Sequence, residues 1–225
     1  MAPGGHATPD AARGGSALDR PPEPVPSTLW LVRHGETEWS RDGRHTGCRS
    51  DPPLTDRGRA QAEELGALLA VVAPSPSLVL TSTLSRAADT CRLAGLGDRA
   101  ETTGDLVEWD YGEYEGRTTA EIRAARPGWS LWADGVPAGE SAADVGRRAD
   151  RVIERARSAT GDVVLVAHAH VLRVLAARWV GLPPAGGRLF HLDVATLSGL
   201  GWEREVPVVS RWNQPAALGR PPRPG

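Results

Sequence analysis

Two strongly apolar runs, each followed directly by a histidine, constrain the fold more than any other feature of this 225-residue chain. Residues 29–32 and 163–167 are continuous apolar segments, which is typical of strands buried on both faces of a sheet. Arg33 and His34 follow the first run, and His168 follows the second. Open α/β sheets bind ligands at the carboxyl ends of such strands. The sequence therefore predicts a ligand site that contains both histidines, with Arg33 and His34 sharing it if the first strand ends at about Val32.

Strand-like and helix-like segments alternate along most of the chain. Thr55, Thr118 and Ser141 are capping residues, each placed before a segment of helical character. Helices are predicted at residues 55–72, 84–93, 118–121 and beyond, 141 to about 161 and 171–180, and strands at 28–33, 78–80, 163–167, 188–202 and 206–212. The last two strands could run antiparallel and close the sheet. This alternation predicts a three-layer α/β/α sandwich with a mostly parallel central sheet.

The two ends of the chain differ in composition from the part between them. Residues 1–27 are rich in Gly, Pro, Ala and Ser, and residues 215–225 are similar. Such segments contain too few apolar side chains to form a core. We expect a disordered N-terminal tail at 1–27, one folded domain at 28–214 and a flexible C-terminal tail at 215–225.

Charge and cysteine content limit the classes of partner and compartment. A net charge of −2 provides no bulk attraction to nucleic acid or to a membrane surface. No apolar stretch approaches the roughly 18 residues of a membrane-spanning helix, and the first 27 residues contain no apolar leader segment. Cys48 and Cys91 are too few for a disulfide framework. We expect free thiols, a cytoplasmic protein, and neither nucleic acid nor membrane as a partner.

The chain contains no lysine, so arginine provides every fixed basic side chain. This composition excludes sites that depend on a Walker-A lysine or a Schiff-base lysine. Anions must be bound by Arg, His and backbone N–H groups. The planar fork of arginine is well suited to a phosphate group.

Seven short motifs follow one another in an order that is more specific than any of them alone. In chain order they are Arg-His-Gly-Glu at 33–36, Thr-Gly at 46–47, Pro-Leu-Thr-x-x-Gly at 53–58, Ser82-x-x-x-Arg86-x-x-x-Thr90, Glu108-x-x-Tyr111-Gly112-x-x-Glu115-Gly116, Gly139-Glu140 and His168-x-His170-x-Leu172-Arg173. From about Thr28 to about Asn213 this series resembles the histidine phosphatase superfamily, also called the phosphoglycerate mutase-like family. The resemblance implies the phosphoglycerate mutase-like form of the α/β/α sandwich.

The resemblance also implies a role for five charged or titratable residues. His34 matches the nucleophile that becomes a phosphohistidine. Arg33, Arg86 and His168 match the groups that bind the phosphoryl oxygens, and Glu108 matches the proton donor to the leaving group. From the residues alone, Arg86 could instead be a surface arginine paired with an aspartate, Asp89 or Asp98.

Five further positions are substrate-binding candidates. Thr46 and Gly47 match a loop that lines the pocket of the family, and His45 in the same loop could meet substrate or lie in solvent. Ser40 stands where mutases usually carry Asn, and its shorter side chain can still donate one hydrogen bond to phosphate. Ala169 stands where Gly usually follows the second catalytic histidine, which fits without strain if its φ is negative.

These residues suffice for phosphoryl transfer by histidine without a metal or a cofactor. A neutral imidazole can attack phosphorus and divide one difficult displacement into two easier ones. Two arginines and a protonated His168 would hold positive charge around the phosphoryl oxygens. A carboxylic acid can protonate the leaving oxygen, and burial beside Trp109 and Tyr111 would favour the protonated form of Glu108. His168 and His170 could also form a metal pair, although no third ligand stands at a convincing spacing.

Three functions remain open at this point. The first is an acid-phosphatase-type phosphomonoesterase acting on a small phosphate ester, since Ser40 and the Glu108 motif are similar to the bacterial broad-specificity acid phosphatase and sugar-bisphosphatase branch. The second is a phosphoglycerate mutase, and the third is a catalytically silent phosphate-binding module. The resemblance leaves a homodimer open as well. Near the predicted site, four arginines could bind a second anionic group or serve solubility, and they are Arg41, Arg44, Arg49 and Arg117.

Overall fold

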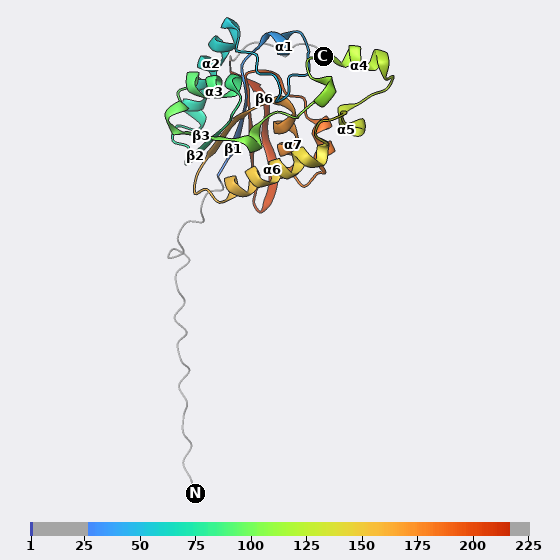
Figure 1. Ribbon diagram of the computed structural model, residues 1–225. Coiled ribbons are helices and arrows are strands. Elements are labelled where there is room, and N and C mark those ends of the chain that lie inside the picture. The colour runs from blue at the N-terminus through green and yellow to red at the C-terminus, as the bar shows by residue number, and fades with distance from the viewer. Residues whose placement is uncertain (2–26, 217–225) are drawn as a thin grey trace.

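Six strands form one sheet in the order β3-β2-β4-β1-β5-β6, with helices on both of its faces (Figure 1). The structure is a computed structural model that describes residue 1 and residues 27–216. The strands are β1 (Leu29–Arg33), β2 (Leu78–Ser82), β3 (Ala100–Thr103), β4 (Val163–Ala167), β5 (Thr196–Glu203) and β6 (Val206–Pro215). The α-helices are α1 (Glu38–Arg41), α2 (Asp56–Val72), α3 (Ser85–Leu93), α4 (Thr119–Ala125), α5 (Leu131–Asp134), α6 (Ala142–Arg157) and α7 (Ala169–Trp179).

The four strands β3, β2, β4 and β1 run parallel, which brings the two histidine-bearing strand ends together. Arg33 at the end of β1 is in register with Ala167 at the end of β4. The backbone N–H of His34 donates to the carbonyl of Ala167 at 3.0 Å. His34 and His168 therefore leave the sheet side by side, as the sequence predicts.

Alternate residues of each central strand face opposite helical layers, because successive side chains in a strand point to opposite faces. Leu31 of β1 belongs to the core beneath α6 and α7. Its neighbours Trp30 and Val32 belong to the core beneath α2 and α3. Figure 1 shows α2 and α3 together on one side of the sheet and α6 with α7 on the other. The predicted sandwich with a mostly parallel sheet is confirmed.

The predicted helix starts follow from their capping residues. The Thr55 hydroxyl accepts from Gly58 N–H at the start of α2. Thr118 and Ser141 form capping boxes with the residues three positions on, which begin α4 and α6. The far ends are less accurate, since α6 ends at Arg157 and not near residue 161. Helix α7 begins at residue 169, two residues earlier than predicted.

The strand predictions need two corrections. Residues 188–202 are not one strand: a 3-10 helix, η5 (Pro184–Leu189), precedes β5, because Gly186 and Gly187 allow the backbone to approach the side chains of Leu182 and Trp132 closely. The edge strand β3 was not predicted, because its sequence, Ala-Glu-Thr-Thr, contains no apolar run. Strand β1 ends at Arg33, as predicted for the strand at 28–33. The antiparallel pairing of β5 with β6 is confirmed.

Two sequence predictions concern regions at or beyond the limits of the described chain. The tails predicted at 1–27 and 215–225 lie almost entirely outside the described residues. Within residue 1 and residues 27–216, no helix combines the length and apolar character needed to cross a bilayer.

Candidate active site

His34 lies just beyond β1, with 4% of its surface exposed. Its Nδ1 is 2.7 Å from the carbonyl oxygen of Gly35. A carbonyl can only accept a hydrogen bond, so Nδ1 carries the proton and Nε2 keeps the lone pair. Burial lowers the pKa of His34 well below its usual value, and the charges of Arg86 and Arg33 lower it further. The imidazole is therefore neutral and presents Nε2 as a nucleophile.

Gly35 keeps this segment against the start of α2. Its N–H donates to the Thr90 hydroxyl at 3.1 Å. A Cβ at Gly35 would overlap the carbonyl oxygen of Gly58, and a Cβ at Gly58 would overlap that of Glu36. Close packing of two backbone segments thus requires glycine at both positions.

His168 is fully buried at the end of β4, and its ring centroid lies 5.1 Å from that of His34. Its Nε2 is 2.8 Å from the Ser82 hydroxyl, which also accepts from Leu84 N–H at 3.2 Å. The Ser82 hydroxyl therefore donates its proton to Nε2, and the single ring proton of the neutral imidazole lies on Nδ1. Burial lowers the pKa of His168 well below its usual value, as do Arg86, His34 and Arg33. The imidazole is therefore neutral in this structure, with Nδ1–H as its free donor. Protonation of His168 with a phosphoryl group beside it stays a prediction.

Arg86 of α3 is completely buried and enters the site beneath the 46–51 loop. Its Nη atoms donate to the carbonyl of Gly47 at 2.8 Å and to Asp51 Oδ1 at 3.1 Å. The alternative of a surface arginine paired with Asp89 or Asp98 is wrong, because Asp89 pairs with the neighbouring Arg92. Burial lowers the pKa of Arg86, and the negative charge of Glu108 opposes that effect.

Arg33 reaches across the end of the sheet and donates from Nη1 to the carbonyl of Leu192 at 2.5 Å. Burial lowers the pKa of Arg33 too, and the charge of Glu108 again opposes the shift. Three nitrogen atoms around His34 are buried without a hydrogen-bond partner in the described part of the chain: Nε of Arg33, Nε of Arg86 and Nδ1 of His168. Each such atom costs about 1–3 kcal/mol unless it is satisfied. A phosphoryl group would supply the missing acceptors.

Glu108 lies in an irregular segment beside the N-terminus of α7, with 3% of its surface exposed. Oε1 accepts from the N–H groups of Trp109 at 2.9 Å and Val171 at 3.0 Å. Oε2 accepts from the N–H of His170 at 2.9 Å. A carboxylate offers about four acceptor sites, so one site on Oε2 is left without a hydrogen bond from the described residues.

The loop that contains Thr46 and Gly47 is attached to the site through its backbone. Gly47 N–H and Ser50 N–H both donate to Glu115 Oε1 at 3.0 Å. Glu115 therefore holds the backbone of this loop in place. The Thr46 hydroxyl donates to the Arg44 carbonyl at 3.4 Å, and the Thr46 carbonyl lies 3.4 Å from Arg86 Nη2.

His45 packs within an aromatic group and does not lie free in solvent. Its ring centroid is 4.8 Å from that of Tyr111 and 5.7 Å from that of Trp129. Its Nε2 is 3.2 Å from the Thr119 hydroxyl. Burial lowers the pKa of His45 to about 4. Contact of His45 with substrate stays a prediction.

Ser40 and Ala169 are the two departures from the family pattern, and the structure supports the expectation for Ala169 but not a phosphate contact for Ser40. The Ser40 hydroxyl accepts from Thr37 N–H and donates to the Thr37 carbonyl, both at 2.9 Å, so it caps α1. Its donor is therefore engaged locally and not directed at a phosphate. Ala169 is the first residue of α7 and has no positive φ, so its methyl group fits without strain.

His170 is held separately from His168. Its Nδ1 lies 2.6 Å from the Tyr111 hydroxyl, and its Nε2 lies 3.3 Å from Arg173 Nη1. Burial lowers the pKa of His170 well below its usual value, and Arg173 lowers it further. In residue 1 and residues 27–216, no three His, Cys, Asp or Glu side chains gather in a way that could hold a metal ion.

The four arginines proposed for a second anionic group all have partners. Arg41 pairs with Asp42, and Arg49 pairs with Asp110. Arg44 donates a hydrogen bond to the carbonyl of Gly116, and Arg117 donates one to the carbonyl of Glu121. These contacts favour a structural role on the surface over a second anion site.

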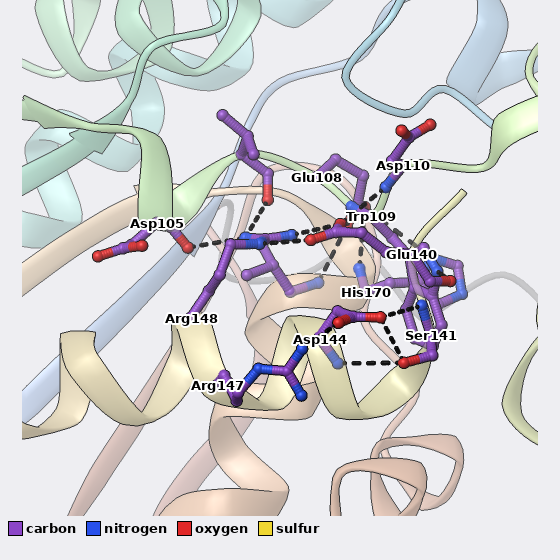
Figure 2. Close-up of polar contacts among 12 residues, drawn as sticks. Asp105, Glu108, Trp109, Asp110, Glu140, Ser141, Asp144, Arg147, Arg148 and His170 are labelled. Atoms are coloured by element: carbon purple, nitrogen blue, oxygen red, sulfur yellow. Dashed lines mark hydrogen bonds and ion pairs between the residues drawn. The ribbon is translucent and has the colours of Figure 1, made fainter. Parts of the chain in front are cut away.

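Two groups of functional interest escaped the sequence analysis. Ser82 stood in a quoted motif, but nothing in the sequence paired it with His168. Figure 2 shows the second group, in which Arg148 and Glu140 form an ion pair and contact the chain before and after Glu108. Glu140 was also part of a motif without an assigned role, and Arg148 is simply one arginine of an amphipathic helix.

The chain is similar in sequence and in structure to several known proteins. Residues 29–215 match the sequence profile of the histidine phosphatase superfamily (branch 1). An acid phosphatase of Mycobacterium tuberculosis is 46% identical over 180 residues, covering 79% of this chain and 88% of the relative. A sedoheptulose 1,7-bisphosphatase of Saccharomyces cerevisiae is 34% identical over 182 residues, covering 68% and 67%. A solved structure of an open reading frame product from M. tuberculosis superimposes with a TM-score of 0.80 at 42% identity, covering 85% of this chain and 99% of that one.

Proposed function

Because the chain belongs to the histidine phosphatase superfamily, we propose that it hydrolyses small phosphate monoesters as an acid-phosphatase-type enzyme, through a phosphohistidine on His34. The observation that carries this proposal is the combination of two features. His34 is a neutral imidazole with its lone pair on Nε2. Buried donors of Arg33, Arg86 and His168 without partners in the described chain surround it.

In the first step, Nε2 of His34 attacks phosphorus while the bond between phosphorus and the ester oxygen breaks. Arg33, Arg86 and the Nδ1–H of His168 stabilise the charge on the phosphoryl oxygens. Glu108 donates the proton held on Oε2 to the leaving oxygen, a contribution of roughly 10²–10⁴-fold in rate. The products are an alcohol, a phosphohistidine and a carboxylate at Glu108.

In the second step, the carboxylate of Glu108 takes a proton from water as the water oxygen attacks phosphorus. The bond between phosphorus and Nε2 breaks, inorganic phosphate is released, and both residues return to their starting protonation states. Each proton is accounted for by Glu108, and the positive charge comes from guanidinium groups. We therefore propose that the reaction requires neither a metal nor a cofactor.

We also propose that residues 28–214 form the folded domain and that the protein acts in the cytoplasm. The elements between Leu29 and Pro215 support the first statement. The free thiols of Cys48 and Cys91 support the second, because such compartments keep thiols reduced. A homodimer stays a prediction.

The test is phosphate release from p-nitrophenyl phosphate and from a panel of sugar phosphates, nucleotides and phosphoglycerates. We expect His34→Ala to lose several orders of magnitude in rate with an unchanged circular dichroism spectrum. Labelled phosphate should be recovered on His34 after a quench in base, and a chelator should leave the rate unchanged. Unchanged phosphate release by His34→Ala contradicts the proposal. Isomerisation of 3-phosphoglycerate that requires the bisphosphate, without net phosphate release, would identify a mutase instead.

A further inference from the structure

We propose that the ion pair between Arg148 and Glu140 is a positioning device for Glu108, and that it governs how well the enzyme protonates poor leaving groups. The proposal rests on the function proposed above. Figure 2 shows the pair beside the segment that carries Glu108, with dashed contacts to the backbone on both sides of it.

Arg148 holds the chain before Glu108. Its side chain, on α6, is 11% exposed. Nη1 donates to the carbonyl of Asp105 at 2.8 Å and to that of Val107 at 3.0 Å. Nε and Nη2 donate to the two carboxylate oxygens of Glu140 at 2.8 Å each. The guanidinium thus binds four acceptors, more than the three N–H groups of a lysine could serve.

Glu140 holds the chain after Glu108. Its Oε2 accepts from Asp110 N–H at 3.0 Å, and its own N–H donates to the Asp110 carbonyl at 2.9 Å. Its carbonyl accepts from the indole N–H of Trp109 at 2.8 Å. The two side chains of the ion pair therefore bind the backbone of residues 105, 107 and 110, and the backbone of Glu140 adds the contact to Trp109.

The segment around Glu108 needs such support because it has no regular structure of its own. Residues 107–111 belong to no helix or strand, so no ladder of backbone hydrogen bonds fixes them. The carboxylate nevertheless meets N–H groups at the start of α7, which itself follows His168. The ion pair and α7 together fix the distance of Oε2 from the phosphoryl pocket. An error of about 1 Å in such a distance can cost roughly 10²-fold in rate.

The chemical consequence depends on the leaving group. An alkoxide is a strong base and leaves only with a proton from Glu108. A p-nitrophenolate is a weak base and leaves without one. Loss of positioning should therefore slow hydrolysis of alkyl phosphates much more than that of p-nitrophenyl phosphate, whereas general damage to the pocket would slow both equally.

The experiment compares kcat/KM for glycerol 2-phosphate and p-nitrophenyl phosphate in the full chain. We expect Arg148→Met and Arg148→Lys to lose at least tenfold more activity on the glycerol ester than on the aryl ester. Arg148→Lys keeps the charge, so retention of full activity on both esters by this variant would overturn the positioning role. Arg148→Met leaves the carboxylate of Glu140 without its partner and could prevent folding. In that case Arg148→Lys alone tests the proposal.

Arg151→Met is the matched control. Arg151 lies on the same helix, is 56% exposed and pairs with the side chain of Asp105, not with the backbone. We expect this variant to leave both rates unchanged. We also expect Glu108→Gln to show the same selective loss, and Arg148→Lys to add little to it, because both changes act on one proton transfer.

Equal losses on the two esters, or fully additive losses with Glu108→Gln, would overturn the inference while leaving the proposed function intact. Failure of the proposed function has a different signature, because His34→Ala would then retain both activities. The two ideas are therefore tested separately in one set of variants.

Discussion

At the scale of single residues, the central feature is a pair of histidines kept neutral beside two guanidinium groups. Burial is the largest cause of the lowered pKa at both His34 and His168, and the nearby arginines add to it. Neutrality preserves the nucleophile on His34. A dianionic phosphate would reverse part of the effect at His168, because a nearby negative charge favours the imidazolium.

Ser82 provides a test of how His168 is oriented. Ser82→Ala removes the hydroxyl that donates to Nε2 of His168. We expect kcat/KM for p-nitrophenyl phosphate to fall about tenfold, equivalent to about 1.4 kcal/mol, the order of one buried hydrogen bond. Steady-state kinetics with a melting-temperature check measures the effect.

Ser77→Ala is the control for this change. Ser77 precedes the same strand, β2, and its hydroxyl bonds to the carbonyl of Asp162 at the opposite end of the sheet. Its kcat/KM should equal that of wild type. Wild-type kinetics in Ser82→Ala would show that the serine does not orient the catalytic ring.

At the scale of elements, local sequence rules predicted where helices begin better than where they end. Thr55, Thr118 and Ser141 each bind a backbone N–H at the start of a helix, an interaction contained within four residues. The end of α6 has no comparable signal, and β3 depends on pairing with β2. Edge strands of polar sequence gain their structure from the neighbouring strand, which local patterns do not reveal.

The cap of α6 offers a stability test. Ser141→Ala removes the acceptor for Asp144 N–H and one half of the capping box. We expect a loss of about 1 kcal/mol in the free energy of unfolding, or about 2–4 °C in melting temperature for a domain of this size. Thermal unfolding followed by circular dichroism measures it. Ser158→Ala, at the other end of α6, should lie within about 0.5 kcal/mol of wild type. Equal stability of the two variants would contradict the capping role.

At the scale of the whole molecule, a parallel sheet places its charged residues at one end and its two cores beneath separate helical layers. Buried histidines are a cost of this arrangement. Burial lowers the pKa of His34, His45, His168 and His170. A histidine with a lowered pKa binds its proton more readily in the unfolded chain than in the folded one. Stability from this source is complete above the unfolded value of about 6.5 and declines as the pH falls below it.

We therefore expect the ligand-free protein to lose stability on acidification from pH 7.5 to pH 5. Urea unfolding at several pH values measures the free energy directly. Inorganic phosphate should offset part of the loss, because a ligand that binds only the folded state stabilises it. A free energy of unfolding that stays constant or rises over this interval would contradict the assignment of neutral histidines.

The sequence by itself determined the central parallel strands of the α/β sheet, the starts of the capped helices and the residue types at the site. These features follow from local periodicity and capping, and the order of the motifs identified the resemblance. The tertiary structure alone decided which partner each group meets. Ser82 lies 86 residues from His168, and Glu108 lies 63 residues from Val171. Such pairings, together with those of Arg86 with Asp51 and of Arg148 with Glu140, arise from strand register and helix packing. The protonation states also depend on them, because burial and neighbouring charge exist only in the folded chain.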